Sequence, residues 1–346
     1  KITEQRFLTN YVNYKLIGEF VDNSTASFFN HERTMNFYRI RKITVKVNYD
    51  PELNRLTICD DAFGMEITDF QRAIKLDSKP ENDSGRNEFG MGLKTAASWF
   101  GNVWSVESTQ LGSSNKYYAK VDINKLREEH LNAINISRTS VPALEHGTTI
   151  IIEDVTKRIN APKTQAKIKD LLSSMYRRDI KSGKVDIYFN NELLTFEEYN
   201  VLKFRNTEWK KPVDFEFIFN NKNYHVTGFV AIMEKGSFPR AGFALFRYDR
   251  VIVGGVDENY KPNEIFGQSQ SQISLKLFGE FNMEDFPVNQ AKDGFVWSDG
   301  LEDEFLYNLK WNIEDYIQIA NMSKQQRADE EEFAKPVSDK VEKIVK

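Results

Sequence analysis

The sequence is poor in the features that define several protein classes. It holds a single cysteine, Cys59, which excludes an intrachain disulfide and suits a reducing compartment. No apolar run of about 18 residues predicts a membrane span, and no signal peptide is visible. The net charge of -4 argues against a chain-wide electrostatic footprint for nucleic acid, although a local basic patch would not register in that sum.

What is present describes an ordinary folded chain. The sequence has 346 residues, of which 40% are hydrophobic and 28% charged, and this length suffices for two domains. It starts at Lys1 instead of a methionine and ends in a charged segment. We therefore expect a processed or truncated chain with an absent region beyond it, located in the cytoplasm, or in the nucleus if the source is eukaryotic.

A pair of glycines directly precedes a helix of small residues. Gly90 and Gly92 flank Met91, and Leu93 and Lys94 follow. Glycine lets the backbone approach an oxyanion, and the free N–H groups and dipole of a helix N-terminus favour its negative charge, so the pattern predicts a phosphate cradle. A plain tight turn into a helix explains the same pattern, and it is not a P-loop because no Gly-Lys-Ser/Thr ends it.

Acidic and amide side chains gather on an earlier predicted helix, residues 4–30. Glu19, Asp22 and Asn23 lie three and four positions apart, which brings their side chains together on consecutive turns. Such a group suits a divalent metal with oxygen ligands, or a general base directed at a water. A solvated acidic edge is the alternative interpretation.

A predicted hairpin, residues 43–49 and 55–59, leads directly into Asp60, Asp61 and a turn at Gly64. A carboxylate at such a strand end can accept a hydrogen bond from an exocyclic amine, although an isolated Asp-turn is commonly a helix cap. The following polar segment, residues 77–88, has no periodicity and lies just before the glycine pair. We interpret it as a lid.

The remaining chain predicts an α+β protein. We expect strands at residues 103–109, 117–123, 147–153, 184–189, 215–219, 224–233, 242–254 and 275–281, and helices at 263–272 and 301–332. Beyond residue 321 the chain is strongly charged, which predicts an exposed helical arm or a solvated tail.

In their order along the chain, these features resemble the GHKL ATPases, the superfamily of gyrase, heat-shock chaperones, histidine kinases and MutL. Residues 17–24 are similar to its first motif. The resemblance implies a Bergerat-type α/β sandwich, with helices over a mixed sheet. It also implies that Glu19 is the general base, that Asn23 holds Mg²⁺ and that Asp22 is a supporting acid.

The later motifs extend this resemblance to the rest of the nucleotide. Residues 60–64 resemble the Asp-x-Gly-x-Gly motif, in which Asp60, or Asp61 in the other register, accepts from the adenine amine; Ala62 replaces the first glycine. The other implied contacts to ATP come from Gly64, Met65, Phe89, Gly90, Met91, Gly92, Leu93, Lys94 and Thr148.

The second half resembles the transducer domain that follows the ATPase fold in gyrase, MutL and MORC proteins. Residues 289–293 are similar to the loop whose lysine reaches the γ-phosphate, and residues 242–252 look like a MORC strand. Lys292 is then a catalytic γ-phosphate sensor, with Gln290 beside the nucleotide. We expect an ATP-binding domain over residues 1–160, a smaller α+β transducer domain with a left-handed βαβ element over 161–320, and a charged helical tail over 321–346.

The resemblance implies an Mg²⁺-dependent ATP hydrolase. ATP-driven homodimerisation would close a clamp, acting on DNA as in MORC and MutL relatives, with a role in defence or restriction if the protein is a prokaryotic MORC-like ATPase. A protein partner through the C-terminal region is a further expectation. The alternatives are a chaperone of the heat-shock type and a non-hydrolysing ATP-binding module. A sensor kinase is disfavoured because His31 follows the first motif.

Overall fold

The computed structural model describes residues 14–75, 92–129, 134–204, 207–255, 259–268, 271–289 and 292–322. The chain forms two compact units. The first comprises Lys1–Glu197 together with Tyr248–Arg250, and the second comprises Glu198–Arg247 and Val251–Lys346. The first unit thus extends past the boundary expected at residue 160, because the strand at residues 185–189 pairs with the first sheet.

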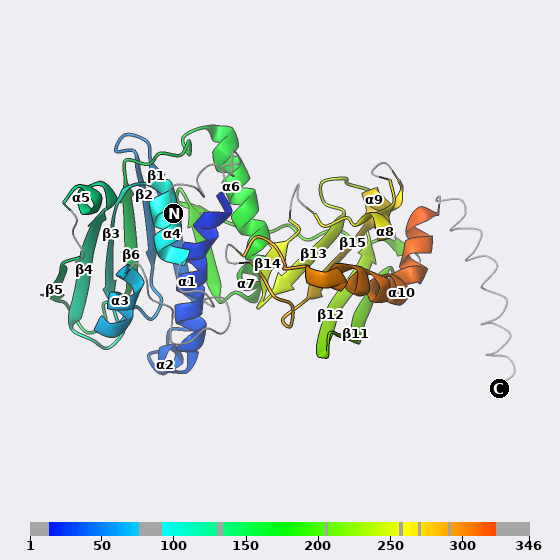
Figure 1. Ribbon diagram of the computed structural model, residues 1–346, viewed down its shortest axis with the longest axis horizontal. Helices are drawn as coiled ribbons and strands as arrows, with labels where there is room; N and C mark the ends of the chain where they lie inside the picture. Colours follow the sequence, from blue (N-terminus) through cyan, green and yellow to red (C-terminus); the bar gives the residue numbers. More distant parts are fainter. Residues whose placement is uncertain are drawn as a thin grey trace, which may run out of the picture. The chain divides into compact units, whose positions relative to one another are not determined.

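A mixed sheet of eight strands forms the first unit, in the order β5-β4-β3-β6-β2-β1-β7-β8 (Figure 1). Neighbouring strands are antiparallel except β1 and β7, which are parallel. This is the α/β sandwich type expected from the sequence. The strands are β1 (Ile43–Asp50), β2 (Arg55–Asp60), β3 (Val103–Thr109), β4 (Asn115–Asp122), β5 (Ile136–Ser140), β6 (Gly147–Glu153), β7 (Val185–Phe189) and β8 (Glu192–Leu193).

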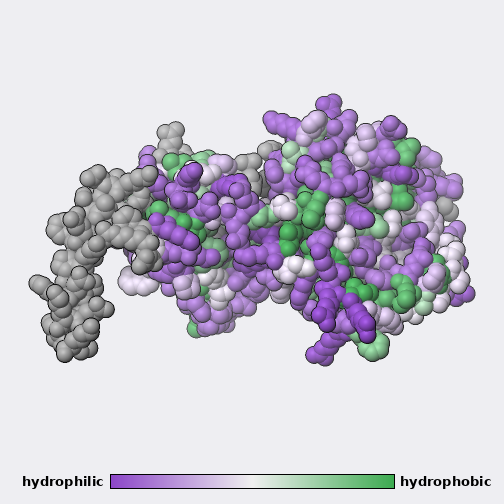
Figure 2. Space-filling model, turned by 180° about the vertical axis from the view of Figure 1, so that it is seen from behind, coloured by the Kyte–Doolittle hydropathy of each residue, from purple (hydrophilic) through white to green (hydrophobic). Residues whose placement is uncertain are grey.

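Alternation of side chains along the strands sets the two faces of this sheet. In β1, Val45 and Val47 are fully buried while Lys46 between them is exposed. Successive strand residues point to opposite faces, so the buried set lines the face covered by helices. Figure 2 shows the molecule from behind, where hydrophilic side chains cover most of the described surface and hydrophobic ones form scattered patches.

Helices α1, α3 and α4 lie over one face of the sheet (Figure 1). Helix α1 follows a short 3-10 turn, Tyr14–Leu16, and buries Phe20, Val21 and Phe28 against the strands. The helices are α1 (Ile17–Asn30), α2 (Glu32–Phe37), α3 (Ile67–Ile74), α4 (Gly92–Phe100), α5 (Ile123–Glu128), α6 (Pro162–Met175) and α7 (Arg177–Ser182). Among all described helices, none has both the length and the apolar character that crossing a bilayer requires.

The second unit contains a five-stranded sheet in the order β11-β12-β15-β13-β14. Strands β13 and β15 are parallel, and two short helices lie between them in the chain. The main elements are β11 (Lys210–Phe219), β12 (Lys222–Ile232), β13 (Gly242–Arg247), β14 (Arg250–Val253), α8 (Asn263–Phe266), α9 (Ile273–Lys276), β15 (Leu277–Asn282) and α10 (Leu301–Asn321), and a separate two-stranded ladder joins β9 (Lys203–Phe204) and β10 (Thr207–Glu208).

One predicted helix of the second unit is wrong in length. Residues 263–272 were expected to form one helix, but α8 ends at Phe266 because Gly267 adopts a positive φ of 61°, which ends a helix readily. The last helix is observed to Asn321, and the part predicted beyond residue 322 lies outside the described residues.

Candidate functional site

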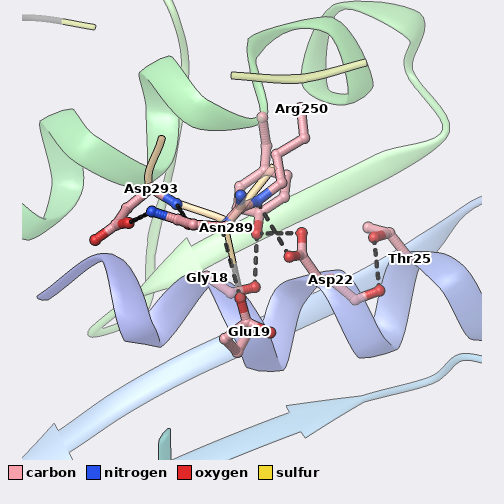
Figure 3. Close-up of polar contacts among 8 residues, drawn as sticks. Gly18, Glu19, Asp22, Thr25, Arg250, Asn289 and Asp293 are labelled. Atoms are coloured by element: carbon pink, nitrogen blue, oxygen red, sulfur yellow. Dashed lines mark hydrogen bonds and ion pairs between the residues drawn. The ribbon is translucent and has the colours of Figure 1, made fainter. Parts of the chain in front are cut away.

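Helix α1 has a buried acidic face. Glu19 is 4% exposed and Asp22 is fully buried. Arg250, whose side chain is also buried, places Nε 3.1 Å from Asp22 Oδ2 and Nη2 3.8 Å from Glu19 Oε1 (Figure 3). The solvated acidic edge considered from the sequence is therefore excluded, since both carboxylates are buried beside a guanidinium.

A tyrosine completes this charged group. Tyr176 is buried, and its hydroxyl lies 2.8 Å from Asp22 Oδ1 and 2.6 Å from the carbonyl oxygen of Gly18. Burial, followed by the negative charge of Asp22, raises the pKa of Tyr176 well above its usual value. The hydroxyl therefore stays protonated and donates to these acceptors. Asp22 is thus held on one oxygen by Tyr176 and on the other by Arg250.

Two observations concern the places where a phosphate and its metal could bind, at the N-terminus of α4 and on α1. A Cβ added to Gly92 would lie 2.0 Å from Glu19 Oε2, so glycine at this position favours the close approach of α4 to this carboxylate. Among the described residues, the buried Nδ2 atom of Asn23 has no hydrogen-bond partner. The side-chain oxygen of Asn23 is a suitable Mg²⁺ ligand, and Mg²⁺ in such sites keeps most of its ligands from phosphates and water.

Protein side chains alone do not build a metal site here. Within the described ranges, no group of three or more His, Cys, Asp or Glu side chains is arranged to hold a metal ion. A magnesium ion at Asn23 would therefore need the oxygens of a bound nucleotide to complete its coordination.

Asp60 lies at the end of β2 and contacts the middle of α1 through Ser24. Its Oδ2 accepts from Ser24 Oγ at 2.6 Å, and its Oδ1 accepts from the backbone N–H groups of Ala62 and Thr148 at 3.0 and 3.2 Å. Burial raises the pKa of Asp60 to about 6, the three hydrogen bonds oppose this shift, and the neighbouring Asp61 adds to it.

The strand pairing explains why Thr148 reaches Asp60. In the register of β2 and β6, Asp60 and Thr148 are direct partners. The Thr148 hydroxyl is also 2.9 Å from Ser108 Oγ on β3, and Ser108 in turn accepts from Met65 N–H at 3.0 Å. Sequence reasoning missed Ser108; the available signal was a pair of polar residues, Ser108 and Thr109, ending a strand of alternating apolar and polar residues.

The turn after β2 needs its glycine. Gly64 has φ +78°, and an added Cβ would lie 1.9 Å from the carbonyl oxygen of Thr109. The turn therefore packs directly on the end of β3, which places Met65 beside Ser108. Gly64 and Met65 belong to the turn that follows Asp60, and their contact with a nucleotide stays a prediction.

Asp61 and Lys94 point to other partners. The Asp61 carboxylate accepts from Thr44 N–H at 2.5 Å, on the neighbouring strand β1. Lys94 is 4% exposed, and its ammonium donates to the backbone oxygen of Lys75, just after α3. Leu93 is buried in the core between the helices and the sheet.

Several predicted site residues cannot be placed against this group. Phe89, Gly90, Met91 and Gln290 lie outside the described residues, as does the predicted lid. Lys292 belongs to the second unit, where its side chain is buried and its backbone has φ 50°. Its loop is closed by the Asn289 amide, which donates to Asp293 at 2.7 Å (Figure 3).

Arg250 was not predicted as a site residue. It begins β14, directly after Tyr248 and Asp249, both of which have positive φ and make the turn from β13. The local signal was an arginine at the start of an otherwise apolar strand. Nothing in the sequence relates that strand to helix α1, which lies far earlier in the chain.

Comparison with known families agrees with this arrangement. Residues 12–157 match the model of a family described as "Histidine kinase-, DNA gyrase B-, and HSP90-like ATPase". The match supports the GHKL superfamily for this part of the chain and, with it, ATP binding and ATPase activity. A search of curated proteins finds no match for the chain.

Proposed function

We propose that the protein hydrolyses ATP with Mg²⁺ in the first unit, and that Glu19 is the general base for the attacking water. The observation that carries this proposal is the approach of Gly92 to the Glu19 carboxylate. The N-terminus of α4 attracts phosphate through its free N–H groups and dipole. A carboxylate beside that point is placed to take a proton from a water attacking the terminal phosphate.

The other residues would bind the rest of the nucleotide. Asn23 would hold Mg²⁺, whose charge stabilises the phosphates. Asp60 would accept from the adenine amine, because Ser24, Ala62 and Thr148 already orient its carboxylate. Gly64, Met65 and Thr148 would form the wall around the base, with Phe89, Gly90, Met91, Gly92, Leu93 and Lys94 on the phosphate side.

The test of hydrolysis is Glu19→Gln, which removes the base but keeps the shape of the side chain. We expect ATP binding within about threefold of the unaltered protein, and phosphate release lowered by about 10²–10⁴-fold. Glu52→Gln, in the exposed turn after β1, is the matched control and should change neither. Unchanged hydrolysis in Glu19→Gln would contradict the assignment, and an unaltered protein that binds ATP without releasing phosphate would point to a regulatory module.

We further propose that ATP closes a homodimeric clamp that acts on DNA, as in a prokaryotic MORC-like ATPase of a defence or restriction system. GHKL ATPases commonly dimerise, and the similarity of residues 242–252 and 289–293 to MORC patterns supports a transducer role for the second unit. In this proposal Lys292 and Gln290 contact the γ-phosphate.

The clamp proposal is tested with the full chain and a non-hydrolysable ATP analogue. We expect a nucleotide-dependent dimer by light scattering and a DNA mobility shift that weakens steeply with salt, since backbone contacts release counterions. Lys292→Ala should weaken the dimer. A dimer without DNA binding at low salt, together with protection of an unfolding protein from aggregation, would favour the chaperone alternative.

A further inference from the structure

The buried carboxylates of helix α1 form ion pairs with an arginine from the β13–β14 turn. Glu19 and Asp22 lie one turn apart on the helix, and their side chains are 5% and 0% exposed. Two carboxylates taken out of water repel each other and favour the protonated form, unless a cation lies beside them. Arg250, with a side chain 2% exposed, is the cation that forms ion pairs with both.

The planar guanidinium faces the two carboxylates with different atoms. Its Nε lies 3.1 Å from Asp22 Oδ2 and its Nη2 lies 3.8 Å from Glu19 Oε1, and both contacts are ion pairs. The shorter contact places the positive charge next to Asp22, and the longer one places it beside Glu19. The fixed fork of arginine makes this geometry, which the single ammonium of lysine cannot reproduce.

Helix α1 is packed closely beside this guanidinium. A Cβ added to Gly18 would lie 2.8 Å from Met175 Sδ, 3.0 Å from Tyr176 Oη and 3.5 Å from Arg250 Nη2. Glycine at this position therefore favours the close approach of Met175 and Tyr176, whereas the distance to Arg250 is an ordinary van der Waals contact. Figure 3 shows Arg250 directed at Asp22 over this stretch of the helix.

Within the first unit, the turn that carries Arg250 makes a second ion pair. Arg178 Nη1, on α7, lies 3.2 Å from Asp249 Oδ1. Asp249 is 65% exposed, so this pair is close to the surface, while the Arg250 group is buried. Asp249 and Arg250 are adjacent in the sequence, but their ion pairs differ in burial. A change at Arg178, the partner of Asp249, is therefore a suitable control for a change at Arg250.

We propose that Arg250 is a positioning residue for Glu19: its guanidinium bridges Asp22 and Glu19, and so keeps the Glu19 carboxylate ionised and aimed for proton transfer. This inference rests on the proposed function, in which Glu19 is the general base. Arg250 does not contact the nucleotide in this proposal. It acts through the charge and the orientation of Glu19.

The experiment uses the full chain and compares Arg250→Met and Arg250→Lys with the control variant Arg178→Met. For each variant we would measure kcat over pH 5–9, the Kd of a fluorescent ATP analogue and thermal unfolding. Arg250→Met should lower kcat by about 10–100-fold, change Kd by less than about threefold, and move the acidic limb of the kcat profile to higher pH. Arg250→Lys keeps the positive charge without the planar guanidinium. It should return the acidic limb of the kcat profile to the pH of the unaltered protein and leave kcat about 3–10-fold below that of the unaltered protein. Arg178→Met should match the unaltered protein.

Each other outcome identifies what fails. If Glu19→Gln hydrolyses ATP like the unaltered protein, the proposed function fails and this inference fails with it. If Glu19→Gln is inactive but folded Arg250→Met keeps kcat within about twofold and an unmoved limb, only the positioning role is overturned. Should Arg250→Met not fold, Arg250→Lys decides, because a kcat equal to that of the unaltered protein would show that the bridging fork is not needed.

Discussion

Two groups of carboxylates beside helix α1 are held in different ways. In the first half of the helix, Glu19 and Asp22 are buried beside the charged guanidinium of Arg250. In its middle, Ser24 donates to Asp60 of β2, and the other two donors to Asp60 are backbone N–H groups, all of them neutral. The Glu19–Asp22 group is thus stabilised by charge pairing, and Asp60 by hydrogen bonds from neutral donors.

This difference matches the chemistry that Glu19 and Asp60 would each perform. An ion pair keeps a buried carboxylate charged, which a general base requires. Neutral donors oppose burial only in part, so the pKa of Asp60 stays raised at about 6. A carboxylate of this kind still accepts a hydrogen bond from a neutral amine at pH 7, and it titrates close to physiological pH.

The largest expected effect is the loss of stability in Asp22→Asn. This change leaves Arg250 buried with one carboxylate fewer, and breaking a buried ion pair costs about 3–5 kcal/mol. Urea unfolding measures it. The control is Asp249→Asn, which breaks the more exposed pair with Arg178 and should cost less than about 1 kcal/mol. Equal costs for the two variants would show that burial of the charges does not separate these pairs.

The next prediction concerns the close approach of helix α4 to Glu19. In Gly92→Ala the new methyl group would meet Glu19 Oε2 at 2.0 Å, and a flexible side-chain end moves more easily than backbone. We expect the fold to survive and Glu19 to be displaced, so that ATP hydrolysis falls by about 10²-fold or more. Circular dichroism and phosphate release measure the two effects.

Thr95→Ala is the matched control for Gly92→Ala. Thr95 is exposed on the same helix, so its truncation should leave hydrolysis unchanged. Full activity in Gly92→Ala would contradict the close approach on which the phosphate assignment depends.

A smaller effect is expected on ATP affinity when pH changes the ionisation of Asp60. Because the pKa of Asp60 rises from 3.8 to about 6 on folding, its ionised fraction falls about tenfold between pH 7 and pH 5. Affinity for ATP should fall with it, since only the carboxylate accepts from the adenine amine without a competing proton. The side chain in Asp60→Asn does not titrate. Fluorescence titration of this variant therefore separates the effect of Asp60 from the titration of ATP itself.

The same pKa shift has the opposite sign for stability. The folded protein binds the proton of Asp60 more tightly than the unfolded chain does. The stability contributed by this group is therefore fully present below about pH 4 and is lost as pH rises through about 6. If Asp60→Asn kept the pH dependence of ATP affinity and of stability, Asp60 would not be the responsible group.

Local patterns predicted most of the first unit. Alternating residues identified β1 and β2, β3 and β6 were also expected as strands, and the spacing of Glu19, Asp22 and Asn23 placed them on one helix face. The motifs also brought Asp60 and Thr148 to one place, which the register of β2 and β6 now explains.

Contacts between distant segments could not be predicted in this way. The pairing of β7 with β1 extends the first unit to residue 197, and no periodicity in either strand specifies the other as its partner. The same holds for Arg250, whose ion pairs with α1 depend on a turn more than two hundred residues later in the chain. Buried charge pairs of this kind leave no local pattern, since an arginine before an apolar strand is also typical of a solvated turn.

The smallest expected effect distinguishes the two adjacent acids at the end of β2. The Asp61 carboxylate accepts from Thr44 N–H on β1, whereas Asp60 is held by Ser24 on α1 and by Thr148 on β6. Asp61→Asn should therefore change ATP affinity by less than about twofold, because an amide oxygen can still accept from Thr44 and the Asp60 contacts remain. Asp60→Asn should weaken binding about tenfold in the same titration, as the loss of one hydrogen bond from a charged acceptor does. The reverse order of effects would assign the adenine contact to Asp61.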